Sequence, residues 1–579
     1  MLRLRCLPQG LPTLNRNVAT GLGAGCLPRR RVGLALQKHA GPWRLRGVAA
    51  AITGLAASTT SKSFASEARA RSALPSERID EVGYITDLEG DLDTFNRYLG
   101  SGRAVLFRDE KEELQLRSPT AAFVFGGDLF DRGPGDLQLA RELVALKKRH
   151  PDRVFLIMGN RDINKMRFTA ELQAEEVALG PDSAFQPWWD PKATKLPDFL
   201  AKKGWTDTPV ARLKWMLTCT LGSPQAFAHR RAELARLAGK DVAEISEEEV
   251  LESYSQSVLD KNGAVVAYLR NAQVGVIIGD TLFVHGAVEK QALGFVPSPT
   301  LRYRRNSPEE VQVGCRRGLA LREWIDGLND FAFQEVEAWQ RSPFWQPSPT
   351  GRVRGGEALM AYQCRPAMAL HTVVVTCYVD GHAMPARKAI DEDKFEGYQK
   401  CSDPMNKEVL EYLLDGGVRR VVVGHKPSGQ APAVLHTAGR DGLGYEVVSA
   451  DTNYASSETS CLRGGSWAEV RISLKAGSSQ TRLHGVLSDG RGQYDFHLPA
   501  LGTSTSEWED GDPLIGRETS DGWWVRVRLG GLKDSESLYL LSKGSGRKAK
   551  YVTKGAGQFQ VFQEPPSLSP RGSASPSAS

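Results

Sequence analysis

Five short segments of the chain each carry a residue able to bind a metal ion, and each follows an apolar stretch. They are Asp87-Leu88-Glu89-Gly90-Asp91, Gly127-Asp128-Leu129-Phe130-Asp131-Arg132-Gly133, Gly159-Asn160-Arg161-Asp162, His285-Gly286 and Gly424-His425. Carboxylate, amide and imidazole ligands together suit divalent cations. Two such cations about 3.5–4 Å apart, sharing one carboxylate, can hold a phosphoryl group and activate the water that attacks it. The pattern therefore indicates a binuclear metal site that acts on phosphate.

Each segment alone is a weak signal. An aspartate at the end of a strand often caps a helix or a turn, and a lone histidine such as His285 is commonly structural. The five segments in this order are much more specific than any one of them, because all five offer metal-binding side chains at the same kind of position.

The apolar stretches that precede the first three segments are predicted to be β-strands. Val82–Thr86, Ala121–Phe125 and Val154–Met158 are short and apolar, and a helical pattern such as Leu137–Lys148 follows. Strand, loop and amphipathic helix in alternation are typical of an α/β sheet. Ligands of such sheets bind at the carboxyl ends of the strands, which is where these loops lie.

The rest of the body is predicted to combine further strands with a helical segment. Residues 163–270 have a helical composition, and residues 300–365 look irregular and are rich in arginine. Further strands are expected at Val274–Ile278, Thr281–Val284, Thr372–Val379, Arg420–Val423, Glu446–Ser449, Ala468–Leu474, Thr481–Leu487 and Gln493–Leu498.

These patterns divide the chain into successive regions. We expect a basic leader over 1–66, a main domain over 79–500 with a helical insertion at 163–270, a linker at 503–517, a small β module at 518–564 and a disordered tail at 565–579.

The composition is that of an ordinary globular protein. Of the 579 residues, 41% are hydrophobic and 25% are charged. No apolar run approaches the roughly 18 residues that a membrane-spanning helix needs, so we predict none. The net charge of +6 comes from the leader, because 1–66 contains ten of the 74 Lys and Arg residues and no Asp or Glu. The remainder has 64 basic and 68 acidic residues, a net charge of −4 that does not indicate nucleic-acid binding.

The acid-free leader resembles a mitochondrial or plastid transit peptide in composition. A secretory signal is less favoured, because the apolar run Val48–Ala57 lies far from Met1. A disordered basic tail is the other alternative.

The five segments together resemble the calcineurin-like metallophosphoesterase superfamily. Gly-Asp-x-x-Asp-Arg-Gly is most similar to the branch of the serine/threonine phosphoprotein phosphatases and bacterial diadenosine tetraphosphatases. The resemblance extends over about residues 79–475. It implies an α/β fold, a four-layer α/β/β/α sandwich, to which this chain adds a helical insertion and a C-terminal β extension.

The resemblance also implies a role for each residue. Asp87 binds the first metal ion, Asp128 bridges both ions, and Asn160, His285 and His425 bind the second. Arg132 binds a phosphate oxygen of the substrate, because a guanidinium matches phosphate geometry, and Asp131 orients its neighbour in the third motif. Asp451 is a further candidate because related phosphatases have a loop near the metals there; a turn-forming aspartate is the alternative. The ions are expected to be two divalent metals, Mn²⁺ or Mg²⁺, with Fe or Zn as alternatives.

Three positions depart from the family pattern. Glu89 stands where the first motif has a histidine; it is either a hard ligand that favours Mn²⁺ or Mg²⁺, or it points away. Arg161 stands where the third motif has a catalytic histidine. Arginine stays protonated and cannot be a general acid, so it either holds phosphate or pairs with Asp131. The second histidine of Gly-His-x-His is absent after His425, as in the protein phosphatase branch.

Further basic and imidazole groups are candidates beside these motifs. Lys165 and Arg167 follow the third motif and reach either a second phosphate or acidic group of the substrate, or solvent from a helix face. His382 in Asp380-Gly381-His382 is an alternative to His425.

The sequence thus predicts a metal-dependent phosphoesterase whose partner is a phosphorylated substrate. The expected reaction is attack of a metal-bridging hydroxide on the phosphorus of an ester or anhydride, without a covalent intermediate. One alternative is a nucleotide or dinucleoside polyphosphate hydrolase rather than a protein phosphatase. Another is a catalytically degenerate metal-binding scaffold. The oligomeric state is not predicted.

Overall fold

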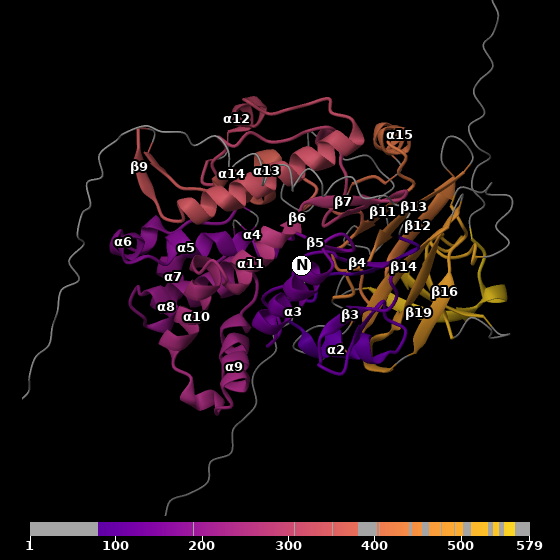
Figure 1. Cartoon of the computed structure of the whole chain (residues 1–579), viewed down its shortest axis with the longest axis horizontal. Helices are drawn as coiled ribbons and strands as arrows, with labels where there is room; N and C mark the ends of the chain where they lie inside the picture. Colours follow the sequence, from indigo (N-terminus) through magenta and orange to yellow (C-terminus); the bar gives the residue numbers. More distant parts are fainter. Residues whose placement is uncertain are drawn as a thin grey trace, which may run out of the picture. The chain divides into compact units, whose positions relative to one another are not determined.

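A seven-stranded and a five-stranded sheet form the centre of the fold (Figure 1). The computed structural model describes residues 79–561, except 189, 191, 306, 350, 380–401, 405, 439–442, 454, 456–462, 476–477, 491, 502–510, 531–536 and 544–548. The predicted leader 1–66, the tail 565–579 and His382 lie outside the described residues.

The seven-stranded sheet contains the strands that precede the first three motifs. In order across the sheet, its strands are β16 (Gln493–His497), β15 (Ser478–Val486), β14 (Trp467–Lys475), β1 (Glu81–Ile85), β4 (Ala121–Phe125), β5 (Val154–Ile157) and β6 (Ala272–Gln273). Strands β1, β4 and β5 pair in parallel. Their carboxyl ends, and the loops that follow them, therefore lie along one edge of the sheet.

The five-stranded sheet contains the strands that precede the two histidines. Its order is β12 (Ala433–Ala438), β13 (Gly444–Ser449), β11 (Arg420–Val423), β8 (Thr281–Val284) and β7 (Gly275–Ile278). Strand β11 pairs in parallel with both β8 and β13. Strands β7 and β8 form a hairpin, because they are consecutive and pair antiparallel.

The two sheets pack face to face through one set of alternate side chains. Val82, Tyr84 and Val124 of the first sheet share a buried cluster with Phe283 and Val422 of the second. The rings of Tyr84 and Phe283 stack with their centroids 5.7 Å apart. The intervening residues of the same strands point to the opposite faces, because side chains alternate along a strand.

Helices cover those opposite faces. The other large core cluster contains Phe123 of β4 with Leu143 of α3 (Asp136–Arg149), and Val421 of β11 with Trp324 of α13 (Leu321–Arg341). The other described α-helices that begin outside residues 163–270 are α2 (Leu92–Gly100), α4 (Asn160–Asn164), α12 (Pro308–Gln312), α14 (Glu357–Cys364) and α15 (Lys407–Asp415). The four-layer α/β/β/α arrangement implied by the resemblance is confirmed.

The segment 163–270 is built of helices that gather beside the sheets (Figure 1). They are α5 (Phe168–Glu171), α6 (Ala174–Ala178), α7 (Leu196–Lys203), α8 (Pro209–Trp215), α9 (Ala226–Ala238) and α10 (Glu247–Leu259), followed by α11 (Ala264–Asn271). A short two-stranded sheet, β9 (Gln346–Ser348) with β10 (Gly351–Val353), and another, β2 (Leu106–Arg108) with β3 (Leu114–Leu116), lie outside the central sheets.

Two expectations from the sequence, for residues 300–365 and for residues 372–379, are wrong. Residues 300–365 are not irregular, because they contain α13, whose Trp324, Leu328 and Trp339 are buried. Residues 372–379 form bends and single bridges rather than a strand. Their backbone instead bonds to the loop after β8, where Gly286 N donates to Val373 O at 2.7 Å and Ala287 N donates to Thr376 O at 3.0 Å.

A three-stranded C-terminal sheet packs against the second sheet. Its strands are β17 (Trp524–Leu529), β18 (Leu538–Lys543) and β19 (Lys550–Gly555). The indole of Trp524 donates to Val434 O in β12 at 3.1 Å. The described part of the predicted linker, 511–517, bonds to strands on both sides, since Asp512 N donates to His497 O and Gly516 N donates to Val525 O, each at 3.0 Å.

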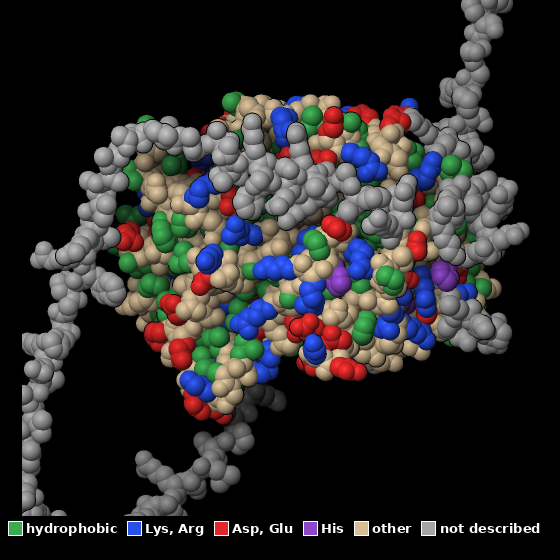
Figure 2. Space-filling model, viewed as in Figure 1, with side chains coloured by type: hydrophobic (Ala, Val, Ile, Leu, Met, Phe, Trp, Pro, Cys, Tyr) green, Lys and Arg blue, Asp and Glu red, His purple; other side chains and the backbone are tan. Residues whose placement is uncertain are grey.

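None of the described helices combines the length and hydrophobicity that crossing a membrane requires. On the face shown in Figure 2, Lys and Arg side chains lie interspersed with Asp and Glu side chains. This mixture matches the nearly balanced charge of the chain after its leader.

Candidate metal centre

The loops from both sheets meet at one site. The first three motifs follow β1, β4 and β5, while His285 follows β8 and His425 follows β11. The loops are tied together by their backbones: Asp87 N donates to Gly127 O at 2.9 Å, and Gly424 N donates to His285 O at 2.9 Å. Side chains from distant parts of the sequence are thereby held within contact of one another.

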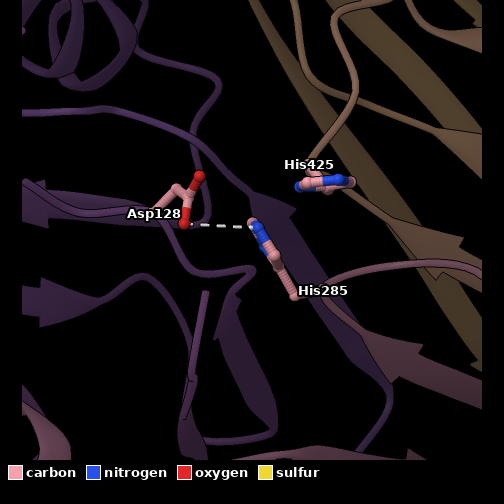
Figure 3. Close-up of side chains that lie close together, drawn as sticks. All are labelled: Asp128, His285 and His425. Atoms are coloured by element: carbon pink, nitrogen blue, oxygen red, sulfur yellow. Dashed lines mark ion pairs between the residues drawn. The ribbon is translucent and has the colours of Figure 1, made fainter. Parts of the chain in front are cut away.

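Three of these side chains form a cluster suited to a metal ion. One ligand atom from each of Asp128, His285 and His425 lies within 4.8 Å of the others (Figure 3). His285 Nε2 is 3.3 Å from Asp128 Oδ1. Asn160 Oδ1 joins them, at 3.3 Å from His285 Nε2 and 2.9 Å from His425 Nδ1. A carboxylate, an amide oxygen and two imidazoles fit a divalent cation, so the structure brings together the residues predicted for the second metal ion.

The surroundings orient the imidazole of His285 and keep Asp128 ionised. His285 Nδ1 lies 2.7 Å from Gly126 O, which turns Nε2 toward the cluster. Burial opposes ionisation of Asp128, but the charge and hydrogen bond of His285 and the charge of Arg161 hold its pKa below the ordinary value. Burial, together with the charge of His285, lowers the pKa of His425 to about 3, so the ring is neutral and able to bind a metal ion.

The site contains unusual backbone conformations. Six non-glycine residues in the described chain have a left-handed φ, and five of them lie in the motifs: Asp87, Glu89, Asp128, Asp131 and His425. Such conformations are unfavourable for residues with a Cβ and occur where the surrounding structure enforces them, often at functional sites.

Two glycines permit the close approach of the loops. A Cβ on Gly159 would lie 2.1 Å from Asp128 Oδ1, and one on Gly424 would lie 2.2 Å from Asp87 Oδ2. Neither position can hold a side chain without moving a predicted ligand, which explains why a glycine precedes both Asn160 and His425.

Glu89 lies in the site, but protein donors occupy its carboxylate. Arg161 Nε lies 2.6 Å from Oε1, while Arg132 Nη1 lies 3.3 Å from Oε2. Asn453 Nδ2 also donates to Oε2, at 2.9 Å. Asp87 is buried beside it, and burial and the charge of Asp451 raise the pKa of Asp87 well above its ordinary value.

Arg161 is held by an extensive set of contacts. Beyond Glu89, its Nη1 donates to Asp131 Oδ2 at 3.3 Å and to Leu221 O and Ser223 Oγ at 3.0 Å each. Of the two roles left open by the sequence, the pairing with Asp131 is therefore present. The partners at 221 and 223 come from the helical segment 163–270, which thus contributes to the site.

Asp451 lies next to the first motif, as the sequence suggested. It is buried, and burial and the charge of Glu89 raise its pKa to about 6, against the effect of Arg463. It also forms a turn, because Asn453 N donates to its Oδ1 at 2.8 Å. The two interpretations of Asp451 are thus compatible in the structure.

Lys165 and Arg167 are placed differently from the prediction. Lys165 Nζ is buried and donates to Asp131 Oδ2 at 2.8 Å. Arg167 is buried in a bidentate pair with Glu171, at 3.0 and 2.8 Å. Neither side chain extends to a substrate or into solvent, because both are buried and bound to carboxylates inside the fold.

Asp162 is a positioning residue that sequence reasoning did not assign. Its carboxylate accepts from the backbone N–H groups of Asp128 at 3.0 Å, Leu129 at 2.8 Å and Gly159 at 2.8 Å. It therefore fixes the second motif to the third. Its place directly after Asn160-Arg161 was the available signal, whereas nothing local marked Ser223.

The C-terminal sheet supports the loop after His425. Arg526 of β17 is fully buried and donates to Ser428 O at 2.7 Å, Pro432 O at 3.1 Å and Ala431 O. Ser428 N in turn donates to Asp451 O at 2.7 Å. One guanidinium thus holds the segment that links His425 to Asp451.

Replacing Arg526 with leucine is expected to lower the free energy of unfolding by about 3 kcal/mol, because three buried carbonyls lose their donor. Metal affinity should fall as well, since the His425 loop loses its support. Urea unfolding and metal titration measure the two effects. Arg528→Leu on the same strand is the control, because its ion pair with Asp512 is long and partly exposed and worth less than about 1 kcal/mol. Equal stability of the two variants would contradict the supporting role.

The comparison with protein families agrees with the first three motifs. Residues 81–216 match the family model of the calcineurin-like phosphoesterases, a segment that includes the first three motifs. A cold-active protein-tyrosine phosphatase of the psychrophile Shewanella sp. aligns with 14% identity and a TM-score of 0.33, over 72% of this chain and 80% of that one. A protein serine/threonine phosphatase from Saccharomyces cerevisiae aligns with 12% identity and a TM-score of 0.28, over 75% and 86%. No curated protein sequence matches. By its motifs and this match, the chain contains a calcineurin-like phosphoesterase domain.

Proposed function

We propose that the protein hydrolyses phosphoanhydrides or phosphate esters that have a weakly basic leaving group. The observation that carries this proposal is the convergence of Asp128, Asn160, His285 and His425 beside the guanidinium of Arg161. Metal-binding side chains and a fixed cation at one place form a site for a phosphoryl group.

The residues of the chain have distinct tasks in this reaction. A bound divalent cation supplies Lewis-acid activation of water and of a phosphoryl oxygen. Asp128, Asn160, His285 and His425 hold that cation. Arg161 is rigidly positioned by Glu89 and Asp131, and it stabilises the negative charge that develops on the phosphoryl oxygens.

Arg161 restricts the reaction to leaving groups that can depart without being protonated. At this position the family pattern has a histidine that protonates the departing oxygen, and a guanidinium cannot donate a proton in this way. Phenols such as the tyrosine side chain, with a pKa of about 10, and phosphate groups leave more readily without a proton than alkyl alcohols do. Aryl phosphates and nucleotide or dinucleoside polyphosphate anhydrides are therefore the favoured substrates, and phosphoserine or phosphothreonine is less favoured.

A panel of substrates tests this proposal. The Mn²⁺-loaded protein is assayed with p-nitrophenyl phosphate, ATP, a dinucleoside tetraphosphate, β-glycerophosphate, and phosphotyrosine and phosphoserine peptides. We expect chelator-sensitive turnover, with kcat/KM for aryl and anhydride substrates at least about 100-fold above that for alkyl phosphates. A preference for the alkyl phosphates would contradict the assigned role of Arg161.

A second candidate is a metal-binding scaffold without turnover. The observation in its favour is the engagement of Glu89 by Arg161, Arg132 and Asn453, which uses a position where the family pattern has a metal-binding histidine. Metal-dependent binding of phosphotyrosine peptide or ATP, without hydrolysis of any substrate in the panel, would establish this alternative.

A further inference from the structure

The two departures from the family pattern contact each other directly. Glu89 and Arg161 stand where the first and third motifs of the family each have a histidine. In this protein they form an ion pair, with Arg161 Nε 2.6 Å from Glu89 Oε1. The side chains are 5% and 14% exposed, so water screens the pair weakly. The two departures from the family pattern are therefore coupled through this ion pair.

The guanidinium contacts both Glu89 and the predicted bridging carboxylate of Asp128. In addition to Glu89, Arg161 Nε lies 3.6 Å from Asp128 Oδ2, and Nη1 lies 3.3 Å from Asp131 Oδ2. Arginine keeps its proton in proteins. A divalent cation placed between Glu89 and Asp128 would therefore meet a like charge that cannot be removed by deprotonation.

Protein donors also occupy the remaining oxygens on this side of the site. Glu89 Oε2 accepts from Asn453 Nδ2 at 2.9 Å. Asp87 Oδ2 accepts from Thr86 Oγ1 at 2.5 Å, and both of its oxygens lie 3.1–3.2 Å from His425 N. Among the described residues, neither Asp87 nor Glu89 joins the cluster of metal-binding side chains.

On the other side of the site, the side chains provide a set of ligands for one metal ion. Asp128, His285 and His425 place ligand atoms within 4.8 Å of one another, and Asn160 Oδ1 lies within 3.3 Å of both rings. The residues present thus fit one of the two ions implied by the family and do not fit the other.

We propose that this site holds a single divalent cation and that the guanidinium of Arg161, fixed by Glu89, Asp128 and Asp131, takes the place of the second. A phosphoryl group would then be held between one metal ion and one organic cation. The inference shares its site with the proposed function, but it concerns the number of ions and is measured without turnover.

Metal stoichiometry tests the inference. The full chain is freed of metal with a chelator and titrated with Mn²⁺, and bound metal per chain is counted by calorimetry and elemental analysis. We expect about one ion per chain in the wild type and about two in Glu89→His/Arg161→His, which restores the family pattern. Arg322→His, at an exposed position of α13, is the matched control and should bind about one ion, as the wild type does.

The electron paramagnetic resonance of bound Mn²⁺ gives an independent readout. The wild type should show the signal of isolated ions at every loading, and the double variant should show the exchange-coupled signal of an ion pair. Two tightly bound ions in the wild type would overturn the inference and leave the proposed function intact. No bound ion would overturn both. If the double variant does not fold, the wild-type metal count still distinguishes one bound ion from two. The single variant Arg161→Leu is then the second test, and it is expected to gain a weaker second ion.

Discussion

Replacing Asp128 with asparagine is expected to reduce phosphoesterase activity by about 1,000-fold or more, at or above the upper end of the loss that follows removal of one preorganised electrostatic group. Asp128 is the carboxylate of the metal cluster, and it accepts from Arg161 N at 2.9 Å while facing His285 Nε2 at 3.3 Å. An amide keeps the shape but removes the charge that balances the cation. Both kcat and bound Mn²⁺ should therefore fall.

Two measurements distinguish this effect from misfolding. The circular dichroism spectrum and the thermal unfolding midpoint of Asp128→Asn should stay close to those of the wild type, because the amide oxygen still accepts from Arg161 N. Asp93→Asn, at an exposed position of α2, is the matched control and should retain full activity and metal content. An Asp128→Asn protein with near-normal turnover and metal binding would show that the site is wrongly assigned.

Arg161→Ala is expected to lower kcat by about 100-fold when assayed with one equivalent of Mn²⁺. The guanidinium is held by Glu89 at 2.6 Å and by Ser223 at 3.0 Å, so it is already oriented before the substrate binds. Its loss removes a fixed positive charge from the phosphoryl group and leaves the carboxylates of Glu89 and Asp131 with fewer partners. Excess Mn²⁺ should restore part of the activity, because a second ion can then occupy the vacated position.

Substrate dependence separates this electrostatic role from a purely structural one. Arg161→His introduces a proton donor and should improve kcat/KM for alkyl phosphates relative to aryl phosphates, while Arg161→Ala should lower both. Arg322→Ala is the control for loss of an arginine from an exposed helix position. If Arg161→Ala equals the wild type on every substrate, the residue only supports Asp131 and Glu89.

The strands that carry the motifs could be recognised from the sequence because their signal is local. Each of β1, β4, β5, β8 and β11 is a short apolar run followed within three positions by a predicted ligand residue. Burial on both faces requires such continuous apolar runs, as in parallel strands generally. The long helix α13 was missed because its arginine-rich neighbourhood obscured the helical spacing of Trp324, Leu328 and Trp339.

The sequence left the roles of Glu89 and Arg161 open, because their partners come from remote segments. Whether Glu89 binds a metal depends on Arg161, Arg132 and Asn453, which lie in three separate segments of the chain. Lys165 and Arg167 illustrate the same limit. Both are charged and follow a motif, yet the fold buries them against Asp131 and Glu171.

By itself, the sequence determined the α/β class, the strand ends that carry chemistry and the types of ligand available. These properties depend on residue type and on spacing over a few positions. Only the tertiary structure decided which donors each carboxylate meets. Loops from two sheets, the helical segment that supplies Leu221 and Ser223, and the C-terminal sheet that supplies Arg526 converge on the site from distant parts of the chain. Hydrogen bonds and ion pairs act over a few ångströms, so the balance of charge at the site follows from that convergence and not from the order of the residues.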